Sequence, residues 1–207
     1  MIQEPVVILA NGNYPTHLIP LQKIEMAASI ICCDGSVNQL IDNGLEPYAI
    51  IGDLDSIDLT LKSKYNKRII HVPDQDENDL QKAIRWADNE GILESTILGA
   101  TGKRDDHSLS NIFILLQLPT LIKCTILTDY GKFTMVEETT ELNSFIGQKV
   151  SIFSADPEIK ITSTNLKYNL ISSSLNNLYC GSLNESINEV FTLAVTHGKI
   201  LVYQVFA

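Results

Sequence analysis

Two carboxylates, Asp53 and Asp55, stand one residue apart directly after the apolar run at residues 49–51. The run is typical of a buried strand, and Gly52 lets the backbone turn where the strand ends. Ligands bind outside the carboxyl ends of the strands in an open parallel sheet, and two carboxylates held there repel each other unless a cation lies between them. Magnesium, which takes one or two carboxylates and keeps several waters, is the cation expected beside a phosphate-bearing substrate. An Asx turn in a solvated loop would explain the same residues, so this motif alone leaves both interpretations open.

Five short apolar runs between residues 6 and 99 are each followed by a cluster of polar residues. The clusters stand at residues 11–13, 34–36, 53–56, 74–79 and 99–107. The carboxyl ends of parallel strands share one edge of the sheet, so the sequence gathers several carboxylates and several glycines in one crevice. Five clusters on the same edge favour a functional site over a set of solvated loops.

The last two clusters each precede a predicted helix. Asp76 and Asp79 lie three residues apart near a helix N-terminus, where the helix dipole stabilises carboxylates; helix capping is the alternative for Asp76 and Asn78. The segment at residues 99–107 joins glycines, two cations and a helix start, which suits a polyphosphate. It is not a Walker A motif, because no Gly-Lys-Ser/Thr closes it. His107 is either a ligand contact or a cap, and a general base is the less favoured role.

The elements that position these clusters alternate between strand and helix. Apolar runs at residues 6–10, 29–33, 49–52, 68–72, 95–99 and 125–128 predict six strands, with amphipathic helices between most of them. This order predicts an α/β layered domain with a mostly parallel, Rossmann-like sheet over residues 1–133. Between residues 134 and 207, apolar residues alternate with polar ones at 149–153, 159–162 and 166–171, which is typical of strands. Residues 190–206 are predicted to form a hairpin. We expect a second, all-β sandwich domain there.

The composition of the chain argues against some classes of binding partner and of metal site. The 207 residues include 15 Lys and Arg against 25 Asp and Glu, for a net charge of −10, which argues against binding to nucleic acid or to an anionic membrane surface. We find no signal peptide and no spanning segment, so we expect a soluble, cytoplasmic protein. The four cysteines show no CxxC spacing, which argues against a zinc site or a disulfide framework, and we expect Cys32 and Cys33 to be small core residues.

The motifs resemble those of the thiamine pyrophosphokinase family over nearly the whole chain. They are Leu-Ala-Asn-Gly at 9–12, Cys-Asp-Gly-Ser at 33–36, Gly-Asp-Leu-Asp-Ser at 52–56, Asp-Gln-Asp-Glu-Asn-Asp-Leu-Gln-Lys-Ala at 74–83, Gly-Ala-Thr-Gly-Lys-Arg-Asp-Asp-His-Ser-Leu-Ser-Asn at 99–111, and the segments 166–170 and 181–185. Asn78 departs from the usual Thr or Ser, and Lys103 stands where the family commonly has Gly. Lys103 either adds a phosphate contact or crowds the loop.

The resemblance implies an ATP-binding catalytic domain, a thiamine-binding β-sandwich, and a homodimer with active sites between subunits. The implied reaction transfers the pyrophosphoryl group of MgATP to the thiamine hydroxyl, giving thiamine diphosphate and AMP. ATP is then the co-substrate and Mg²⁺ the cofactor. A pyrophosphokinase for a hydroxymethyl-pterin and a non-catalytic nucleotide- or thiamine-binding module are the alternatives.

Site roles follow from the resemblance and from the charges together. The catalytic residues are expected to be Asp53, Asp55, Asp79 and Gln75, with the three aspartates binding Mg²⁺. The ATP-binding residues are expected to be Asp34, Asp76, Gly102, Arg104, Asp106 and His107. In the second domain Tyr168 would offer its ring to the cationic thiazolium, unless it packs in the sheet, and Ser182 and Asn184 would hydrogen-bond the pyrimidine.

Overall fold

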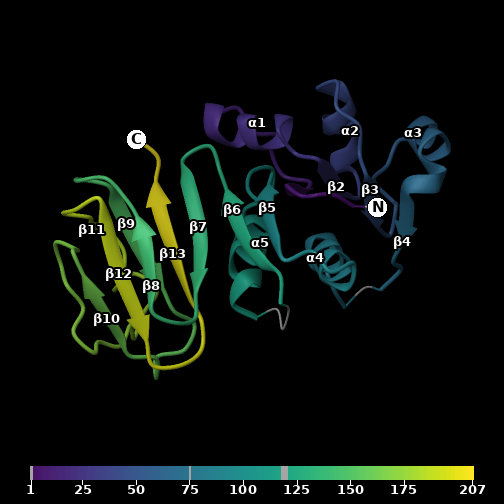
Figure 1. The fold of residues 1–207 in the computed structure, drawn as a ribbon. Coiled ribbons are helices and arrows are strands. Elements are labelled where there is room, and N and C mark those ends of the chain that lie inside the picture. Colours follow the sequence, from purple (N-terminus) through teal and green to yellow (C-terminus); the bar gives the residue numbers. More distant parts are fainter. Residues whose placement is uncertain (1, 75, 118–120) are drawn as a thin grey trace. The chain divides into compact units, whose positions relative to one another are not determined.

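A computed structural model describes residues 2–74, 76–117 and 121–207. The chain divides into two compact units, Met1–Asp129 and Tyr130–Ala207 (Figure 1). The boundary expected from the sequence, between residues 133 and 134, lies inside β7 (Gly131–Val136), which pairs along its whole length with β13 (Ile200–Val205) of the second unit.

The first unit is built on a parallel sheet with the strand order β6-β5-β1-β2-β3-β4. Its strands are β1 (Val6–Leu9), β2 (Ser29–Cys33), β3 (Ala49–Gly52), β4 (Ile69–His71), β5 (Glu94–Leu98) and β6 (Lys123–Leu127). Its helices are α1 (Leu18–Glu25), α2 (Ser36–Asp42), α3 (Leu59–Lys64), α4 (Asp79–Asn89) and α5 (Asp105–Gln117), with a short 3₁₀ turn at Asn66–Arg68. The expected α/β fold class is confirmed.

The direction of the strand order changes at β1. From β1 the chain adds β2, β3 and β4 on one side, and then returns to place β5 on the other side of β1. Such a switch point opens a crevice at the carboxyl ends of the strands, because the loops on its two sides run in opposite directions. The polar clusters after β1 and β5 therefore become neighbours.

Burial explains why the central strands show no alternation of apolar and polar residues. Every residue of β1, β2 and β3 is buried, as expected for parallel strands that helices cover on both faces. Helix α4 packs against β1, β2 and β3, and its apolar residues Leu80, Ala83, Ile84 and Ala87 are buried. This packing fixes the N-terminus of α4 at the edge of the sheet that carries the polar clusters.

The second unit is a sandwich of two antiparallel sheets, as predicted. One has the order β11 (Asn184–Glu185), β9 (Lys149–Phe153), β13 and β7; the other has the order β10 (Ile161–Thr164), β12 (Val190–Val195) and β8 (Thr140–Asn143). Phe191, Ile152 and Val202 are fully buried in the core of this unit. Apolar residues on alternate positions of both sheets supply this core.

Two details of the predicted second domain are wrong. The expected hairpin does not form, because β12 pairs with β8 and β10 whereas β13 pairs with β7 and β9. The alternating segment at 166–171 makes a single bridge, between Leu166 and Ser186, rather than a strand. There the Asn169 side chain accepts a hydrogen bond from Leu166 N at 3.2 Å, and such local side-chain bonds compete with strand pairing.

The cysteines are unpaired thiols. Cys32 and Cys33 are buried, as predicted; Cys124 is also buried, whereas Cys180 is exposed. Burial raises the pKa of Cys32 to about 12, so this thiol stays protonated at neutral pH. Among the described residues, no helix is both long enough and apolar enough to cross a membrane.

Candidate active site

A cleft of about 680 Å³ lies at the carboxyl ends of the parallel strands, wholly within the first unit. Each of the five polar clusters found in the sequence contributes to its lining. Charged residues of the lining include Asp34 after β2, Asp53 and Asp55 after β3, Asp79 at the start of α4, and Lys103 and Arg104 after β5. The crevice predicted from the order of strands and clusters is therefore present.

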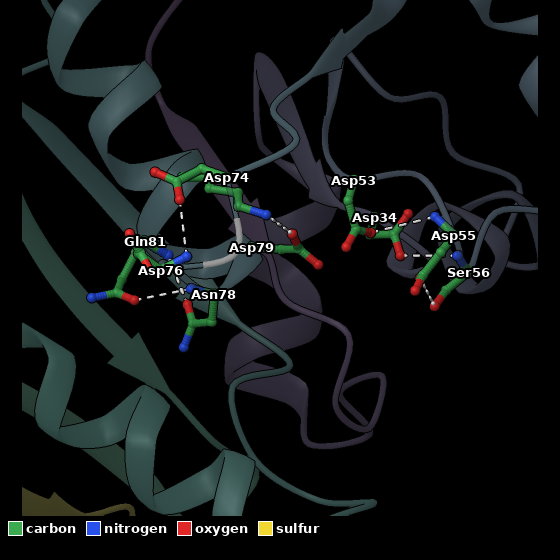
Figure 2. Close-up of polar contacts among 10 residues, drawn as sticks. Asp34, Asp53, Asp55, Ser56, Asp74, Asp76, Asn78, Asp79 and Gln81 are labelled. Carbon is green, nitrogen blue, oxygen red and sulfur yellow. Dashed lines mark hydrogen bonds and ion pairs between the residues drawn. The ribbon is translucent and has the colours of Figure 1, made fainter.

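Three carboxylates meet in this cleft. Asp34, Asp53 and Asp55 each place one oxygen within 4.8 Å of the others, and Figure 2 shows their side chains directed toward one another. Leu54, the residue between the two β3 aspartates, has φ of 69° and is 7% exposed. Its buried side chain anchors a turn that is unfavourable for leucine, so that both flanking aspartates reach the cleft.

Gly52 allows this close approach. A Cβ at residue 52 would lie 2.9 Å from Asp34 Cβ and 3.1 Å from Asp79 Oδ1. Because these distances are below van der Waals contact, any side chain there would push β3 away from the neighbouring aspartates. The glycine in the Gly-Asp-Leu-Asp motif is thus required by packing as well as by the turn.

Asp34 has the environment of a cation ligand. Burial raises the pKa of Asp34 to about 6, although its Oδ2 accepts a hydrogen bond from Ser56 N at 3.1 Å. Its Oδ1 is buried, and no described residue donates a hydrogen bond to it. Buried oxygens normally have a partner. An unsatisfied carboxylate oxygen beside two more carboxylates fits Mg²⁺, which prefers oxygen ligands.

Asp79 lies next to these three carboxylates but is held by a cation of the chain. Its Oδ1 accepts a hydrogen bond from Lys82 Nζ at 3.2 Å, and the Lys82 side chain is 2% exposed. Burial raises the pKa of Asp79, Lys82 lowers it, and the charges of Asp53 and Asp55 raise it further. The three carboxylates that meet are therefore those of Asp34, Asp53 and Asp55, whereas Asp53, Asp55 and Asp79 were expected from the sequence. The assignment of Asp79 to the metal stays a prediction.

The start of α4 explains the departure at residue 78. Asn78 Oδ1 accepts a hydrogen bond from Gln81 N at 2.9 Å, and Gln81 Oε1 accepts one from Asn78 N at 3.0 Å. Asn78 is thus the N-cap of a reciprocal capping box, a role that Thr or Ser also fills. Asp76 N donates to Asp74 Oδ1 at 2.9 Å in the turn before the helix (Figure 2). Gln75, expected to be catalytic, lies outside the described residues.

Backbone hydrogen bonds join the loops after β1 and β5. Gly12 N donates to Gly99 O at 2.7 Å, and Asn13 N donates to Thr101 O at 2.8 Å. A Cβ at Gly12 would overlap the backbone oxygens of Thr101 and Gly99. The two loops are therefore in backbone contact, and together they form one wall of the cleft.

Arg104 and Asp106 form a pair at the start of α5. Arg104 Nε and Nη2 donate to the two Asp106 carboxylate oxygens at 3.1 and 2.5 Å. This guanidinium lowers the pKa of Asp106 to about 2. Arg104 and His107 line the cleft, as does Gly102, so these three predicted nucleotide contacts lie at the predicted place. Asp106 pairs with Arg104 but is outside the lining of the cleft.

The predicted thiamine contacts lie in the second unit. Tyr168 is 64% exposed, so the alternative in which its ring packs in the sheet is wrong. Asn184 is buried, and its side chain accepts from Tyr168 N at 3.1 Å and donates to Tyr168 O at 2.8 Å. Ser182 Oγ donates to Tyr179 O at 2.7 Å. Asn184 therefore fixes the backbone that presents Tyr168, and contacts of these residues with a substrate stay predictions.

Lys82 is the site residue that sequence reasoning missed. It is 4% exposed, lines the cleft and forms the ion pair with Asp79. The spacing of Asp79 and Lys82 in the sequence could have indicated this ion pair, because residues three apart on a helix are neighbours. A lysine beside the apolar face of a buried helix needs a charged partner, and Asp79 was the carboxylate at that spacing.

Removing the charge of Asp34 is expected to stabilise the protein when no divalent cation is present. The folded-state pKa is about 6 against an ordinary value of 3.8, so the folded state holds this proton more tightly, and stability falls as the pH rises from about 4 to 6. Asp34→Asn should remove this loss, worth up to about 3 kcal/mol above pH 6. Urea unfolding in EDTA at pH 4.5 and 7 measures it; equal pH dependence in both proteins would contradict the buried charge.

Comparison with known proteins places the chain in a family. Residues 21–127 match the family model for the thiamin pyrophosphokinase catalytic domain, and residues 131–203 match the model for the thiamin pyrophosphokinase substrate-binding domain. Thiamin pyrophosphokinase 1 of Caenorhabditis elegans is 28% identical over 80% of this chain and 72% of its own length. Thiamine pyrophosphokinase 1 of Oryza sativa subsp. japonica is 26% identical over 96% of this chain and 86% of its own length.

Solved structures agree in fold over almost the whole chain. Thiamine pyrophosphokinase from Bacillus subtilis has a TM-score of 0.78 at 21% identity, covering 97% of this chain and 98% of that one. Thiamin pyrophosphokinase from Candida albicans has a TM-score of 0.80 at 16% identity, covering 98% of this chain and 90% of that one. Two family models that follow each other along the chain and relatives that span both units lead to one conclusion: the chain belongs to the thiamine pyrophosphokinase family of enzymes.

Proposed function

We propose that the protein transfers the pyrophosphoryl group of MgATP to the hydroxyl of thiamine, giving AMP and thiamine diphosphate. The observation that carries this proposal is a single cleft in which the Asp34, Asp53 and Asp55 carboxylates share the sheet edge with a glycine-rich, cationic loop. Membership of the family supports the choice of thiamine as acceptor. Incubation with MgATP and thiamine, followed by identification of both products, tests it.

The carboxylate cluster is the proposed site of Mg²⁺, with Asp79 beside it. When bound, the ion supplies positive charge that offsets the charge of the phosphates during transfer. The chain's own contribution is to hold three carboxylates at a spacing that would be repulsive without a cation. Gly52 and the buried Leu54 maintain that spacing through packing.

Phosphate groups are proposed to lie along the loop after β5. The N-terminus of α5 presents backbone N–H groups there, and Arg104 adds a planar, charged donor. In the proposed reaction the thiamine hydroxyl oxygen forms a bond to the β-phosphorus, and the bond from that phosphorus to the oxygen bridging to the α-phosphate breaks. AMP leaves with the bridging oxygen. Positioning and charge neutralisation supply most of the catalysis in such transfers.

We assign to Asp79 the role of accepting the hydroxyl proton, in place of the metal-binding role expected for it from the sequence. It lies outside the cluster of three, and burial raises its pKa, which makes it a better base than an ordinary aspartate. The Lys82 ammonium holds one of its oxygens at 3.2 Å. Lys82 thereby keeps Asp79 oriented and stabilises its ionised form before the proton arrives.

Tyr168 is proposed to stack on the cationic part of thiamine. Tyr168→Ala should raise KM for thiamine several-fold and leave KM for ATP nearly unchanged, because an exposed cation–π contact is worth roughly 0.5–2 kcal/mol. Tyr168→Phe keeps the ring and is the control, expected near wild type. Steady-state kinetics with each substrate varied in turn measures this. An equal rise in both KM values, or no rise, would contradict the stacking role.

The net charge of the chain bears on the alternative functions. A pterin is neutral, whereas this chain carries a net charge of −10, a field that favours a cationic acceptor. Faster turnover of hydroxymethyl-dihydropterin than of thiamine would reverse the assignment, and binding without turnover would support a non-catalytic module. The homodimer and the cytoplasmic location expected from the sequence stay predictions, which sedimentation equilibrium and cell fractionation would measure.

A further inference from the structure

Lys103 has a backbone conformation that disfavours lysine. Its φ is 59°, directly after Gly102 with φ of 87°. The left-handed region is open to glycine but unfavourable for a residue with a Cβ. A non-glycine residue held in this conformation inside a functional cleft indicates that its side chain has a use there.

The side chain of Lys103 extends to the neighbouring loop. Lys103 Nζ donates a hydrogen bond to Asn11 Oδ1 at 2.9 Å, joining residues 92 positions apart in the sequence. Both residues line the cleft. The bonds from Gly12 N to Gly99 O and from Asn13 N to Thr101 O join the loop that carries Lys103 to the loop that carries Asn11.

Charge distinguishes Lys103 from the other cations of the cleft. Lys82 is paired with the Asp79 carboxylate at 3.2 Å, and Arg104 is paired with the Asp106 carboxylate at 2.5 Å. Within the described ranges, the hydrogen-bond partner of the Lys103 ammonium is a neutral amide oxygen. Its charge is therefore available to an anion, and an ionised phosphate oxygen is a stronger acceptor than an amide oxygen.

We propose that Lys103 exchanges Asn11 for the polyphosphate of the nucleotide and is a specific phosphate-binding residue of this enzyme. The loop after β5 and the loop after β3 are separated at the sheet edge by β1 and β2. A polyphosphate that meets the carboxylate cluster at one end thus has the Lys103 ammonium on the other side of the switch point. The inference rests on the proposed function for the nucleotide only, since it makes no use of thiamine.

A charge-only substitution tests the role of Lys103. Lys103→Gln keeps a hydrogen-bond donor for Asn11 and the same unfavourable backbone, but it has no charge, whereas Lys103→Arg keeps the charge. Calorimetric titration of the full chain without thiamine should show MgATP and inorganic tripolyphosphate binding about tenfold more weakly to Lys103→Gln. Lys103→Arg should bind both within about threefold of wild type, and adenosine should bind equally to all three.

Matched controls show whether weaker binding comes from the lost contact of Lys103, from the change in net charge or from a loss of folding. Lys67 is exposed, stands in the 3₁₀ turn at Asn66–Arg68 and is outside the cleft lining. Lys67→Gln should therefore leave every affinity unchanged. Lys103→Asn serves as a second neutral variant, because asparagine adopts left-handed φ readily, and it should show the same tenfold loss with an unchanged melting temperature.

The results have distinct meanings. Unchanged MgATP affinity in both neutral variants, or an equal loss for adenosine, would overturn the inference, since Lys103 would then act on the loop rather than on phosphate. A phosphate-specific loss that Lys103→Arg restores supports it. Failure of the wild type to turn over thiamine, with this pattern of nucleotide affinities intact, would sink the proposed reaction and leave the role of Lys103 standing.

Discussion

Replacing Asp53 or Asp55 with asparagine is expected to lower kcat by a factor of about 10² or more without unfolding the protein. Each side chain places an oxygen within 4.8 Å of the other two carboxylates of the cluster. The carboxamide keeps the shape of the side chain but loses the charge that would bind Mg²⁺. Initial rates across a Mg²⁺ titration, together with melting temperatures, measure the effect.

The control for these variants is an exposed aspartate outside the cleft. Asp42 in α2 is exposed and does not line the cleft, so Asp42→Asn changes net charge by the same amount and should keep wild-type kcat. Near-normal, Mg²⁺-dependent turnover in both Asp53→Asn and Asp55→Asn would show that these two aspartates form a structural turn rather than a metal site. A large loss in Asp42→Asn would show that net charge rather than the cluster is responsible.

Gly12→Ala is expected to produce the largest loss of stability, about 3 kcal/mol. The added methyl group would overlap the backbone oxygens of Thr101 and Gly99. Gly99 O accepts a hydrogen bond from Gly12 N, and Thr101 O accepts one from Asn13 N, so neither oxygen can move without breaking a bond between the two loops. The loops after β1 and β5 would have to separate. Urea unfolding gives the free energy, and nucleotide affinity should fall as well because both loops line the cleft.

Gly91→Ala is the matched control for that substitution. Gly91 has φ of 81°, and a Cβ there meets nothing within 4 Å, so alanine adds only the unfavourable backbone conformation, roughly 1 kcal/mol. We expect a small loss of stability and an unchanged nucleotide affinity. Equal losses from the two substitutions would contradict the claim that close packing of the two loops builds the wall of the cleft.

The pattern of strands and helices in the first unit was predictable because its core is regular. Long apolar runs correspond to strands buried on both faces, and the apolar period of α4 corresponds to the face it packs on the sheet. Helix α3 buries none of its residues, so it left no period to detect. In the second unit, alternation identifies the residues that face a core but not the partner of each strand, which is why β12 and β13 were wrongly paired.

The location of the site was predictable for a topological reason, whereas the partners within it were not. Clusters after parallel strands must share an edge, so Asp34, Asp53 and Asp55 were correctly expected in one crevice. Which carboxylates approach each other depends on φ at Asp34 and Leu54, 41° and 69°, and on the space left by Gly52. Backbone conformations of this kind are determined by tertiary packing, so the cluster with Asp34 in place of Asp79 required the structure.

Isotope tracing of the phosphates tests the proposed reaction most directly. The protein is incubated with Mg²⁺, thiamine and ATP labelled at the β-phosphorus, and the products are separated. Pyrophosphoryl transfer predicts unlabelled AMP and label in thiamine diphosphate, in equal amounts and dependent on Mg²⁺. Labelled ADP with thiamine monophosphate would mean transfer of the terminal phosphate alone, and it would contradict the account.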